Sequence, residues 1–187
     1  MTGLPLQVNG AVRLEPLAER HRKPLKAACA ADQAIWAIYS IDLGGDGFDH
    51  WFDSVTGSAP AWLMWAVCLD GALVGMTGLS PDARHPGVVE VGTSYLAPAV
   101  RGSGLNRMVK WMVLSHLFGT GFHRVEFRVD NRNARSKAAV LKLGARHEGL
   151  LRRHKRTHTG FIRDTNIFAL LDTDWPRIEP AMRPRAP

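Results

Sequence analysis

A glycine-rich turn, Arg101-Gly102-Ser103-Gly104-Leu105-Asn106, separates a run typical of a β-strand, residues 88–96, from a segment with helical periodicity. Glycines let a backbone approach a ligand closely, and the first N–H groups of a helix have no partner inside the helix. Together with the helix dipole, such groups bind anions such as phosphate. An ordinary strand-to-helix turn is the alternative, because a lone Gly-x-Gly is a weak signal.

A second residue that could do chemistry is Glu90, the one acid in an otherwise apolar strand over residues 88–92. A half-buried carboxylate has a raised pKa, and such a group suits a general base that acts through water. The alternative is that Glu90 faces solvent or pairs with an arginine.

Other chemistries have weaker support in the sequence. His154 and His158 lie in a cationic segment with no cysteine or carboxylate at metal-ligand spacing, so we expect no metal. The turn lacks the third glycine of a dinucleotide fingerprint and the Gly-Lys-Ser/Thr of a nucleotide-triphosphate loop. The two cysteines, Cys29 and Cys68, fit reduced packing residues better than a disulfide framework.

Length and composition favour one globular domain: 187 residues, of which 45% are hydrophobic and 22% charged. No apolar stretch is long enough for a membrane span, and the N-terminus lacks the pattern of a signal peptide, so we expect a cytoplasmic protein without a membrane partner. The net charge of +7 is spread along the chain, with one concentration at residues 152–156. Such a charge would attract an acidic cofactor as well as nucleic acid.

Periodicity and turn signals predict an α/β order of elements. Strands are expected over residues 12–17, 62–69, 72–79, 88–96, 123–129, 145–156 and 161–171. Helical segments are expected over residues 18–37, 48–55, 104–117 and 136–143. Asp70-Gly71 predicts a tight hairpin, and Thr159-Gly160 a second one. The proline-rich, basic residues 176–187 are expected to be a loosely ordered tail, so that residues 1–175 form the domain.

This order of elements, with the glycine turn after the fourth strand, resembles the GNAT superfamily of acyl-coenzyme A N-acetyltransferases. The turn of that family reads Arg/Gln-x-x-Gly-x-Gly/Ala; Arg101 and Gly104 match it, and Asn106 departs from it. The second half of the chain is similar to the branch that contains the ribosomal-protein N-terminal acetyltransferases. That similarity rests on Asn133-Ala134-Arg135-Ser136 and on Leu143-Gly144-Ala145 after it.

The resemblance implies one domain with a mixed, mostly antiparallel twisted sheet of about seven strands and flanking helices. This sheet would be splayed between strands 4 and 5, the strand with Glu90 and the strand that ends at Asp130, and acyl-CoA would enter the gap. Backbone amides of the turn would hold its pyrophosphate, Asn133 its pantetheine arm, and Ser136 would lie near the thiol. The implied cofactor-binding residues are Leu96, Arg101, Gly102, Ser103, Gly104, Leu105, Asn106, Asn133 and Ser136.

Many members of the family carry a tyrosine seven residues after the asparagine as the general acid, and here that position is Val140. We expect Ser136 to replace it, which makes Glu90 and Ser136 the predicted catalytic residues. Ser136 is equally suited to be a helix N-cap, and the thiolate can also leave unprotonated into solvent.

The acceptor amine would bind where the family builds its acceptor pocket. The aromatic residues expected there are Trp36, Tyr39, Trp51 and Phe52, with a role in the core as the alternative. An aromatic pocket accepts an apolar or cationic amine, whose charge acids of the same region could hold: Asp42, Asp46, Asp49 and Asp53.

The sequence therefore predicts an N-acetyltransferase that transfers an acetyl or other short acyl group from acyl-CoA to a primary amine by direct attack. A small amine and a peptide or protein N-terminus both remain open as acceptors. Val140 and Asn106 motivate an alternative, a catalytically weakened acyl-CoA-binding sensor or partner-binding module. Nucleic acid is not the expected partner, because no nucleic-acid-binding fold matches the element order. A homodimer through the C-terminal hairpin is expected only by analogy.

Overall fold

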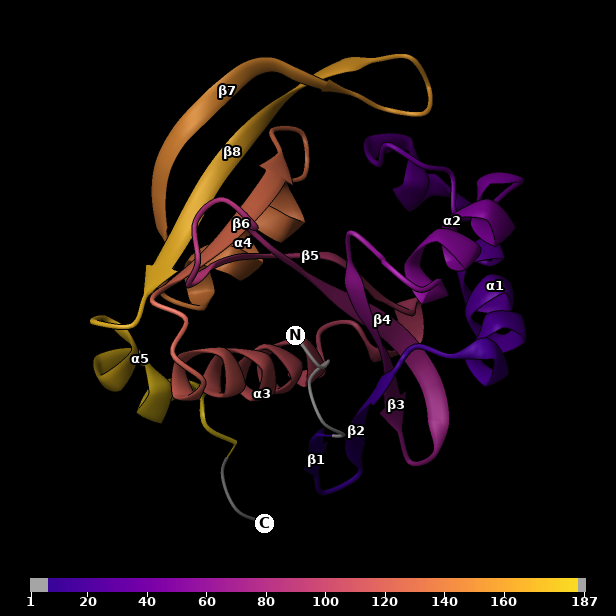
Figure 1. Cartoon of the computed structure of the whole chain (residues 1–187). Coiled ribbons are helices and arrows are strands. Elements are labelled where there is room, and N and C mark those ends of the chain that lie inside the picture. Colours follow the sequence, from indigo (N-terminus) through magenta and orange to yellow (C-terminus); the bar gives the residue numbers. More distant parts are fainter. Residues whose placement is uncertain (1–6, 185–187) are drawn as a thin grey trace.

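The computed structural model describes residues 7–184, which form one twisted sheet covered by helices on both faces (Figure 1). Its strands are β1 (Gln7–Asn9), β2 (Val12–Pro16), β3 (Leu63–Leu69), β4 (Ala72–Pro81), β5 (Val88–Leu96), β6 (Arg124–Asp130), β7 (Arg146–Arg156) and β8 (Ile162–Leu171). Its α-helices are α1 (Arg22–Ala30), α2 (Gly47–Thr56), α3 (Leu105–Gly119), α4 (Ala134–Lys142) and α5 (Trp175–Met182). Short 3₁₀ helices are η1 (Glu19–His21), η2 (Gln33–Ile38) and η3 (Pro98–Val100).

The eight strands lie in the order β1-β2-β3-β4-β5-β6-β8-β7. Every neighbouring pair is antiparallel except β5 and β6, which are parallel. This confirms the mixed, mostly antiparallel sheet; the strand beyond the seven expected is the three-residue β1, which pairs with β2. A parallel pair needs a long crossover connection, and the connection from β5 to β6 contains α3.

Local turn signals placed several elements correctly. Asp70 and Gly71 both have positive φ angles, 49° and 81°, as a two-residue hairpin turn between β3 and β4 requires. The strand β5 has the bounds expected from its apolar pattern, residues 88–96.

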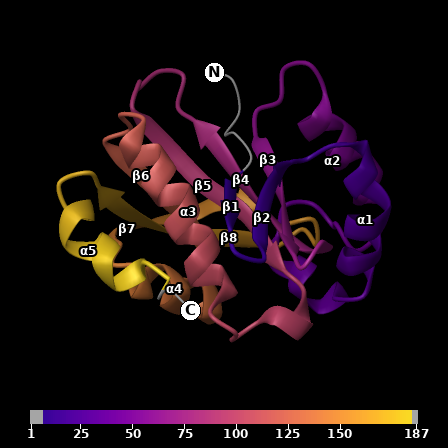
Figure 2. The ribbon, with the colours of Figure 1, turned by 90° about the horizontal axis from the view of Figure 1, so that it is seen from below.

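Successive residues of β3 serve two different cores, because side chains alternate between the faces of a strand. Trp65 and Val67 belong to the larger core, which the sheet forms with α3, α4 and α5. Met64 belongs to the second core, which the opposite face forms with α1, η2 and α2. Viewed from below, α3 and α5 lie apart from α1 and α2 (Figure 2).

The expectation of one helical segment over residues 18–37 is wrong. That stretch is divided into η1, α1 and η2. After α1, the indole of the buried Trp36 donates a hydrogen bond to the carbonyl oxygen of Cys29 at 2.9 Å. This contact satisfies a carbonyl at the end of α1 and turns the chain back, which helical spacing alone does not reveal.

The expectation of a loose tail from residue 176 is also wrong as far as the structure describes that tail. Trp175, Ile178 and Met182 are buried on one face of α5, against the larger core. The indole of Trp111 in α3 donates a 2.7 Å hydrogen bond to Glu179 of α5. The folded domain therefore continues past residue 175, and the last residues of the expected tail, 185–187, lie outside the described part.

At the edge of the sheet opposite β1, the strands β7 and β8 form a long hairpin that arches away from the core (Figure 1). The strand β7 is the edge strand and is exposed along most of its length. Dimerisation through this hairpin stays a prediction. None of the helices in the described residues is long and apolar enough to cross a membrane.

The role of α5 can be tested with Ile178→Ala. We expect this variant to lower the free energy of unfolding by about 2–4 kcal/mol, because it empties a buried site between α5 and the larger core. Arg177→Ala is the matched control, since its side chain is 71% exposed and makes only a surface ion pair, worth at most about 1 kcal/mol. Urea unfolding measures both; equal stabilities of the two variants would mean that α5 does not support the core.

Candidate functional site

The cavity of interest opens where β5 and β6 separate. The two strands pair only through Val88–Glu90 and Arg124–Glu126; beyond that, β5 continues beside β4, and β6 continues beside β8. A cavity of about 610 Å³ lies in the resulting gap, between the first turns of α3 and α4 and the segment η2. The predicted splay between the strand with Glu90 and the strand that ends at Asp130 is therefore present.

The glycine turn lies at one end of this cavity. Gly102 and Gly104 have φ angles of 81° and 88°, in the left-handed region that favours glycine. Neither has an atom within 4 Å of where a Cβ would stand, so the requirement is conformational rather than one of space. Gly104 is the N-cap of α3, so N–H groups without a partner inside the helix follow it directly; that of Leu105 donates to Ser103 Oγ at 3.4 Å.

The predicted cofactor-binding residues of this region differ in whether they line the cavity. Five of them line the cavity: Leu96, Arg101, Gly102, Gly104 and Asn106. The side chain of Leu105 instead packs in the larger core, and the hydroxyl of Ser103 donates to the carbonyl of Val100 at 2.8 Å. Neither is a lining residue, so any contribution of these two residues to a ligand would come from their backbone.

The guanidinium of Arg101 is already engaged within the protein. Its Nε donates to the carbonyl oxygen of Leu96 at 2.8 Å, and its Nη2 forms an ion pair with Asp32. It also lies 5.6 Å from the ring centroid of Tyr95. Arg101 thus ties the glycine turn to the end of β5 and to the segment that leads into η2.

The second predicted motif lies across the cavity, at the start of α4. Asn133 is the N-cap of this helix, and its Oδ1 accepts the backbone N–H of Ser136 at 3.0 Å. Both residues line the cavity. The cap is therefore Asn133 and not Ser136, which leaves the hydroxyl of Ser136 and the amide nitrogen of Asn133 for other partners.

Glu90 lies on β5 just before the strands diverge, and its side chain is 18% exposed. Burial raises the pKa of this carboxyl, and the charge of Arg128 opposes the rise; the Nε of Arg128 lies 3.4 Å from Oε2 of Glu90. Glu90 is not itself a lining residue, but Gly92 and Arg128 beside it are. Glu90 is thus half-buried, and it also pairs with an arginine, as the alternative expected; its role as a base stays a prediction.

The strand β5 contains a bulge within the cavity wall. Thr93 has a φ angle of 46°, and the register shifts so that Thr93 and Ser94 stand opposite Thr77 of β4. The Nζ of Lys110 in α3 donates to Ser94 Oγ at 2.6 Å and to Thr77 Oγ1 at 2.9 Å. Lys110 of α3 therefore stabilises the bulge through hydrogen bonds to both strands that form it.

Sequence reasoning missed Lys110, which is 5% exposed and lines the cavity. Burial lowers its pKa from the ordinary value of 10.5 to about 7. No carboxylate of the described residues forms an ion pair with it, and its two partners are neutral hydroxyls. The position within α3 gives no sequence signal for this, since lysine is common on helices.

Of the four aromatic residues predicted to bind the acceptor, only Tyr39 lines the cavity. Its hydroxyl donates to the carbonyl of Ser94 at 3.2 Å, and burial raises its pKa. Trp36, Trp51 and Phe52 are at most 5% exposed and belong to the second core. For these three the structure favours the core role, because aromatic residues at helical spacing bury against the sheet whether or not a pocket lies nearby.

The acids expected to hold the charge of the acceptor do not lie at the cavity either. Asp49 pairs with Lys26 at 2.5 Å, and Asp53 pairs with Arg22 at 2.5 Å, both on the exposed surface of α1 and α2. Asp42 accepts the N–H of Gly44, and Asp46 is exposed. The expected anionic subsite is therefore absent from the described wall of the cavity.

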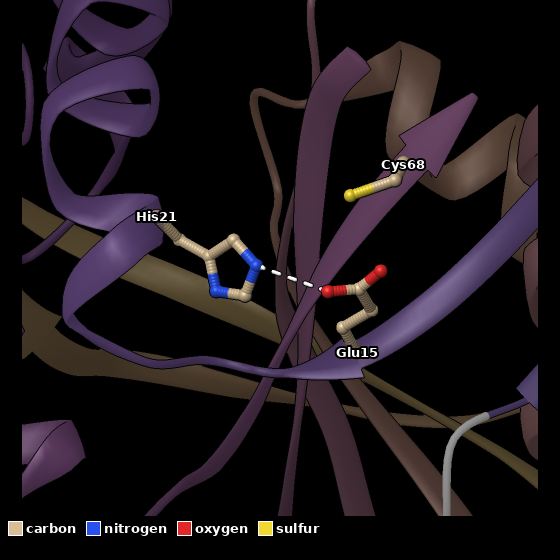
Figure 3. A group of neighbouring side chains, drawn as sticks. All are labelled: Glu15, His21 and Cys68. Carbon is tan, nitrogen blue, oxygen red and sulfur yellow. Dashed lines mark ion pairs between the residues drawn. The ribbon is translucent and has the colours of Figure 1, made fainter. Parts of the chain in front are cut away.

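One group of possible metal ligands in the described chain lies elsewhere: Glu15, His21 and Cys68 (Figure 3). The backbone N–H of Ala18 donates to His21 Nδ1 at 3.1 Å, so the ring proton belongs on Nε2, which lies 3.4 Å from Oε2 of Glu15. The same Oε2 accepts a 2.8 Å hydrogen bond from Arg20. The Nε2 lone pair that a metal needs is thus occupied by a proton, and the arrangement fits a hydrogen-bond network at the start of α1.

Comparisons with known proteins agree with this geometry. The profile of the family described as "Acetyltransferase (GNAT) domain" matches residues 11–146. A GCN5-related N-acetyltransferase from Brucella melitensis is similar in structure, with 27% identity, a TM-score of 0.87, and coverage of 95% of this chain and 83% of that chain. A probable GNAT-family acetyltransferase from Chromobacterium violaceum is 29% identical, with a TM-score of 0.83 and coverage of 93% and 90%.

A third solved structure shares the fold at lower identity. Mycobacterium smegmatis RimJ, in complex with CoA-disulfide, is 24% identical, with a TM-score of 0.78 and coverage of 95% of this chain and 90% of that chain.

The buried Lys110 predicts an unusual dependence of stability on pH. Its pKa is lowered in the folded state, so the unfolded chain binds more protons between pH 7 and about 10.5, and stability rises with pH there. The penalty for burying the ammonium is fully present below pH 7. In Lys110→Met the rise of stability with pH that Lys110 causes, up to about 1.4 kcal/mol per pH unit, should disappear. The variant should also be more stable than wild type at pH 7, because it has no ammonium to bury.

Urea unfolding at several pH values between 6 and 10 (roughly the range that this linkage spans) tests the prediction. Lys142→Met, at an exposed position of α4, is the control and should leave the dependence unchanged. Parallel curves for wild type and Lys110→Met would show that the buried ammonium costs no stability.

Proposed function

The chain belongs to the GNAT acetyltransferase family, and we propose that it transfers an acetyl or other short acyl group from acyl-CoA to a primary amine, which attacks the thioester directly. The observation that carries this proposal is the cavity between β5 and β6, with the glycine turn at one end and Glu90 beside its wall. A protein that transfers an acyl group from coenzyme A to an amine has to bind the anionic pyrophosphate and the amide-bearing arm of coenzyme A next to a group that takes the proton of the amine.

Coenzyme A would lie with its pyrophosphate on the N–H groups at the start of α3, where helix geometry leaves them unpaired. Its pantetheine arm carries amides, and beyond Glu90 the β5 edge that faces β6 has no strand partner. Unpaired backbone groups at a strand edge bind such a chain by β-type hydrogen bonds. The free amide nitrogen of Asn133, across the cavity, would donate to the same arm. The structure of the similar RimJ is a complex with CoA-disulfide, which supports coenzyme A as the ligand.

Glu90 would act as the general base through water. In the reaction, the neutral amine attacks the thioester carbon, a C–N bond forms, and the C–S bond breaks as the tetrahedral intermediate collapses. The ammonium proton goes to the carboxylate, and the thiolate takes a proton from Ser136 or from solvent. The raised pKa of Glu90 supports this role, because a stronger base takes the proton more readily near neutral pH.

The coenzyme site is tested first by calorimetric titration with acetyl-CoA and desulfo-CoA. We expect saturable binding to wild type and at least about tenfold weaker binding to Gly104→Trp, because the indole would stand in the cavity at the mouth of the anion site. Gly121→Trp is the matched control: Gly121 also has a positive φ and open surroundings, but it follows the opposite end of α3. Equal binding to the two variants would refute the site.

The base is tested with Glu90→Gln. We expect kcat to fall by about 10²-fold or more, with little change in the affinity for acetyl-CoA. In wild type, kcat should rise with pH through the elevated pKa of Glu90, since the carboxylate is the active form, and this limb should be lost in the variant. Glu126→Gln is the control, because Glu126 stands opposite Glu90 in the sheet and also pairs with Arg128. Unchanged turnover of Glu90→Gln across pH would remove Glu90 from the mechanism.

A further inference from the structure

Arg163, near the start of β8, is a cation of the cavity wall without a partner in the protein. No carboxylate of the described residues lies within ion-pair distance of its guanidinium, and no described side chain or carbonyl accepts a hydrogen bond from it. Its Nε is fully buried with no hydrogen-bond partner. Arg163 is partly exposed and lines the cavity, and Nε is its one buried nitrogen without a partner, so its remaining donors are accessible.

The two carboxylates that act on Arg163 are already committed to other arginines. Asp130 receives hydrogen bonds from Nε and Nη2 of Arg132, at 3.1 and 2.8 Å. Glu90 pairs with Arg128 at 3.4 Å. The attraction of Asp130 and Glu90 therefore does not compensate for the burial of Arg163, and burial lowers its pKa.

The surroundings of Arg163 contain further positive charge, from Lys155 and Arg128. His154 on the neighbouring strand β7 also has a buried ring nitrogen, Nδ1, with no partner. Burial and the charges of Lys155, Arg128 and Arg163 all lower the pKa of His154. A partly buried cation without a counter-ion is costly, so a protein keeps one where a ligand supplies the missing charge.

The chemistry of that ligand follows from the guanidinium of Arg163 and from its position in the cavity. A guanidinium presents parallel N–H donors that match the two oxygens of a carboxylate. Besides burial, Asp130 and Glu90 are the groups that affect the pKa of Arg163 most, and both raise it. Glu90 is the residue that the proposed function makes the base, so the bound anion lies close to the reacting groups and not at the glycine turn.

We propose that Arg163 binds a carboxylate of the reacting substrates, carried either by a dicarboxylic acyl chain on coenzyme A or by the amine acceptor beside its amino group. This inference rests on the proposed acyl transfer and narrows it. Polyamines and other acceptors with only positive charge are disfavoured by the surplus of arginine. The aromatic and acidic pocket expected from the sequence is replaced by a basic one.

Two matched comparisons distinguish the sources of the carboxylate. In the donor arm, succinyl-CoA and butyryl-CoA are titrated into the protein by calorimetry, because they have equal chain length and differ in the terminal carboxylate. In the acceptor arm, the protein saturated with coenzyme A is titrated with amino acids and acidic peptides, and with their methyl esters. Rates of thiol release are measured for the same pairs.

We expect wild type to favour the carboxylate member of one arm by at least tenfold in affinity and in kcat/KM. Arg163→Met should reduce this preference to about one while leaving the constants for the uncharged member within about threefold. Arg163→Lys keeps the charge but loses the two parallel N–H donors, so it should retain part of the preference. Arg152→Met, which removes an exposed cation of β7 outside the cavity wall, should retain all of it.

A preference in the donor arm assigns the carboxylate to the acyl chain, and a preference in the acceptor arm assigns it to the amine. Wild type that binds coenzyme A but prefers the carboxylate in neither arm overturns the proposal, and so does a preference that survives in Arg163→Met. Failure of all acyl-CoA binding would instead refute the proposed function, so the two failures are distinguishable. Unfolding curves of the Arg163 variants verify that they are folded.

Discussion

The parallel pairing of β5 with β6 over only three residue pairs is the constraint on which the rest of the site depends. Two parallel neighbours need a crossover, and the crossover helix α3 starts at the C-terminal end of β5. Its dipole and its unpaired N–H groups are thereby placed at the mouth of the gap that the diverging strands leave open. Because β4 holds β5 and β8 holds β6, the gap is a stable property of the sheet and does not need a ligand to open it.

Three of the cations in the wall of this cavity are held in different ways, and the difference bears on function. Arg101 has an ion pair with Asp32 and a carbonyl acceptor, so it is part of the scaffold of the turn. Lys110 has two hydroxyl partners and fixes the bulge of β5. Arg163 has neither, and its charge is left for a ligand. The sequence alone gives these three residues the same charge and does not show which of them lacks a partner in the protein.

Much of the fold follows from local signals. The left-handed conformations at Asp70-Gly71, Gly102 and Gly104 are properties of the residues themselves, so the hairpin and the turn could be placed correctly. The helix α5 could not, because its two prolines read as a helix breaker, whereas its stability comes from packing of Ile178 and Met182 on α3 and the sheet. Trp36, Trp51 and Phe52 were placed at a pocket because the spacing that buries an aromatic residue in a core is the same as the spacing that lines a cleft.

By itself, the sequence determined the order of the elements, the glycine turn before α3, and the position of one acid in an apolar strand. These depend on backbone preferences within a few residues. Only the tertiary structure decided which polar groups find a partner, since the partners come from distant parts of the chain: Asp32 lies 69 residues before Arg101, and Thr77 lies 33 residues before Lys110. Arg163 is left with no partner in the described chain for the same reason. Hydrogen bonds and ion pairs form between groups that the fold brings within about 3 Å, and residue type does not specify that proximity.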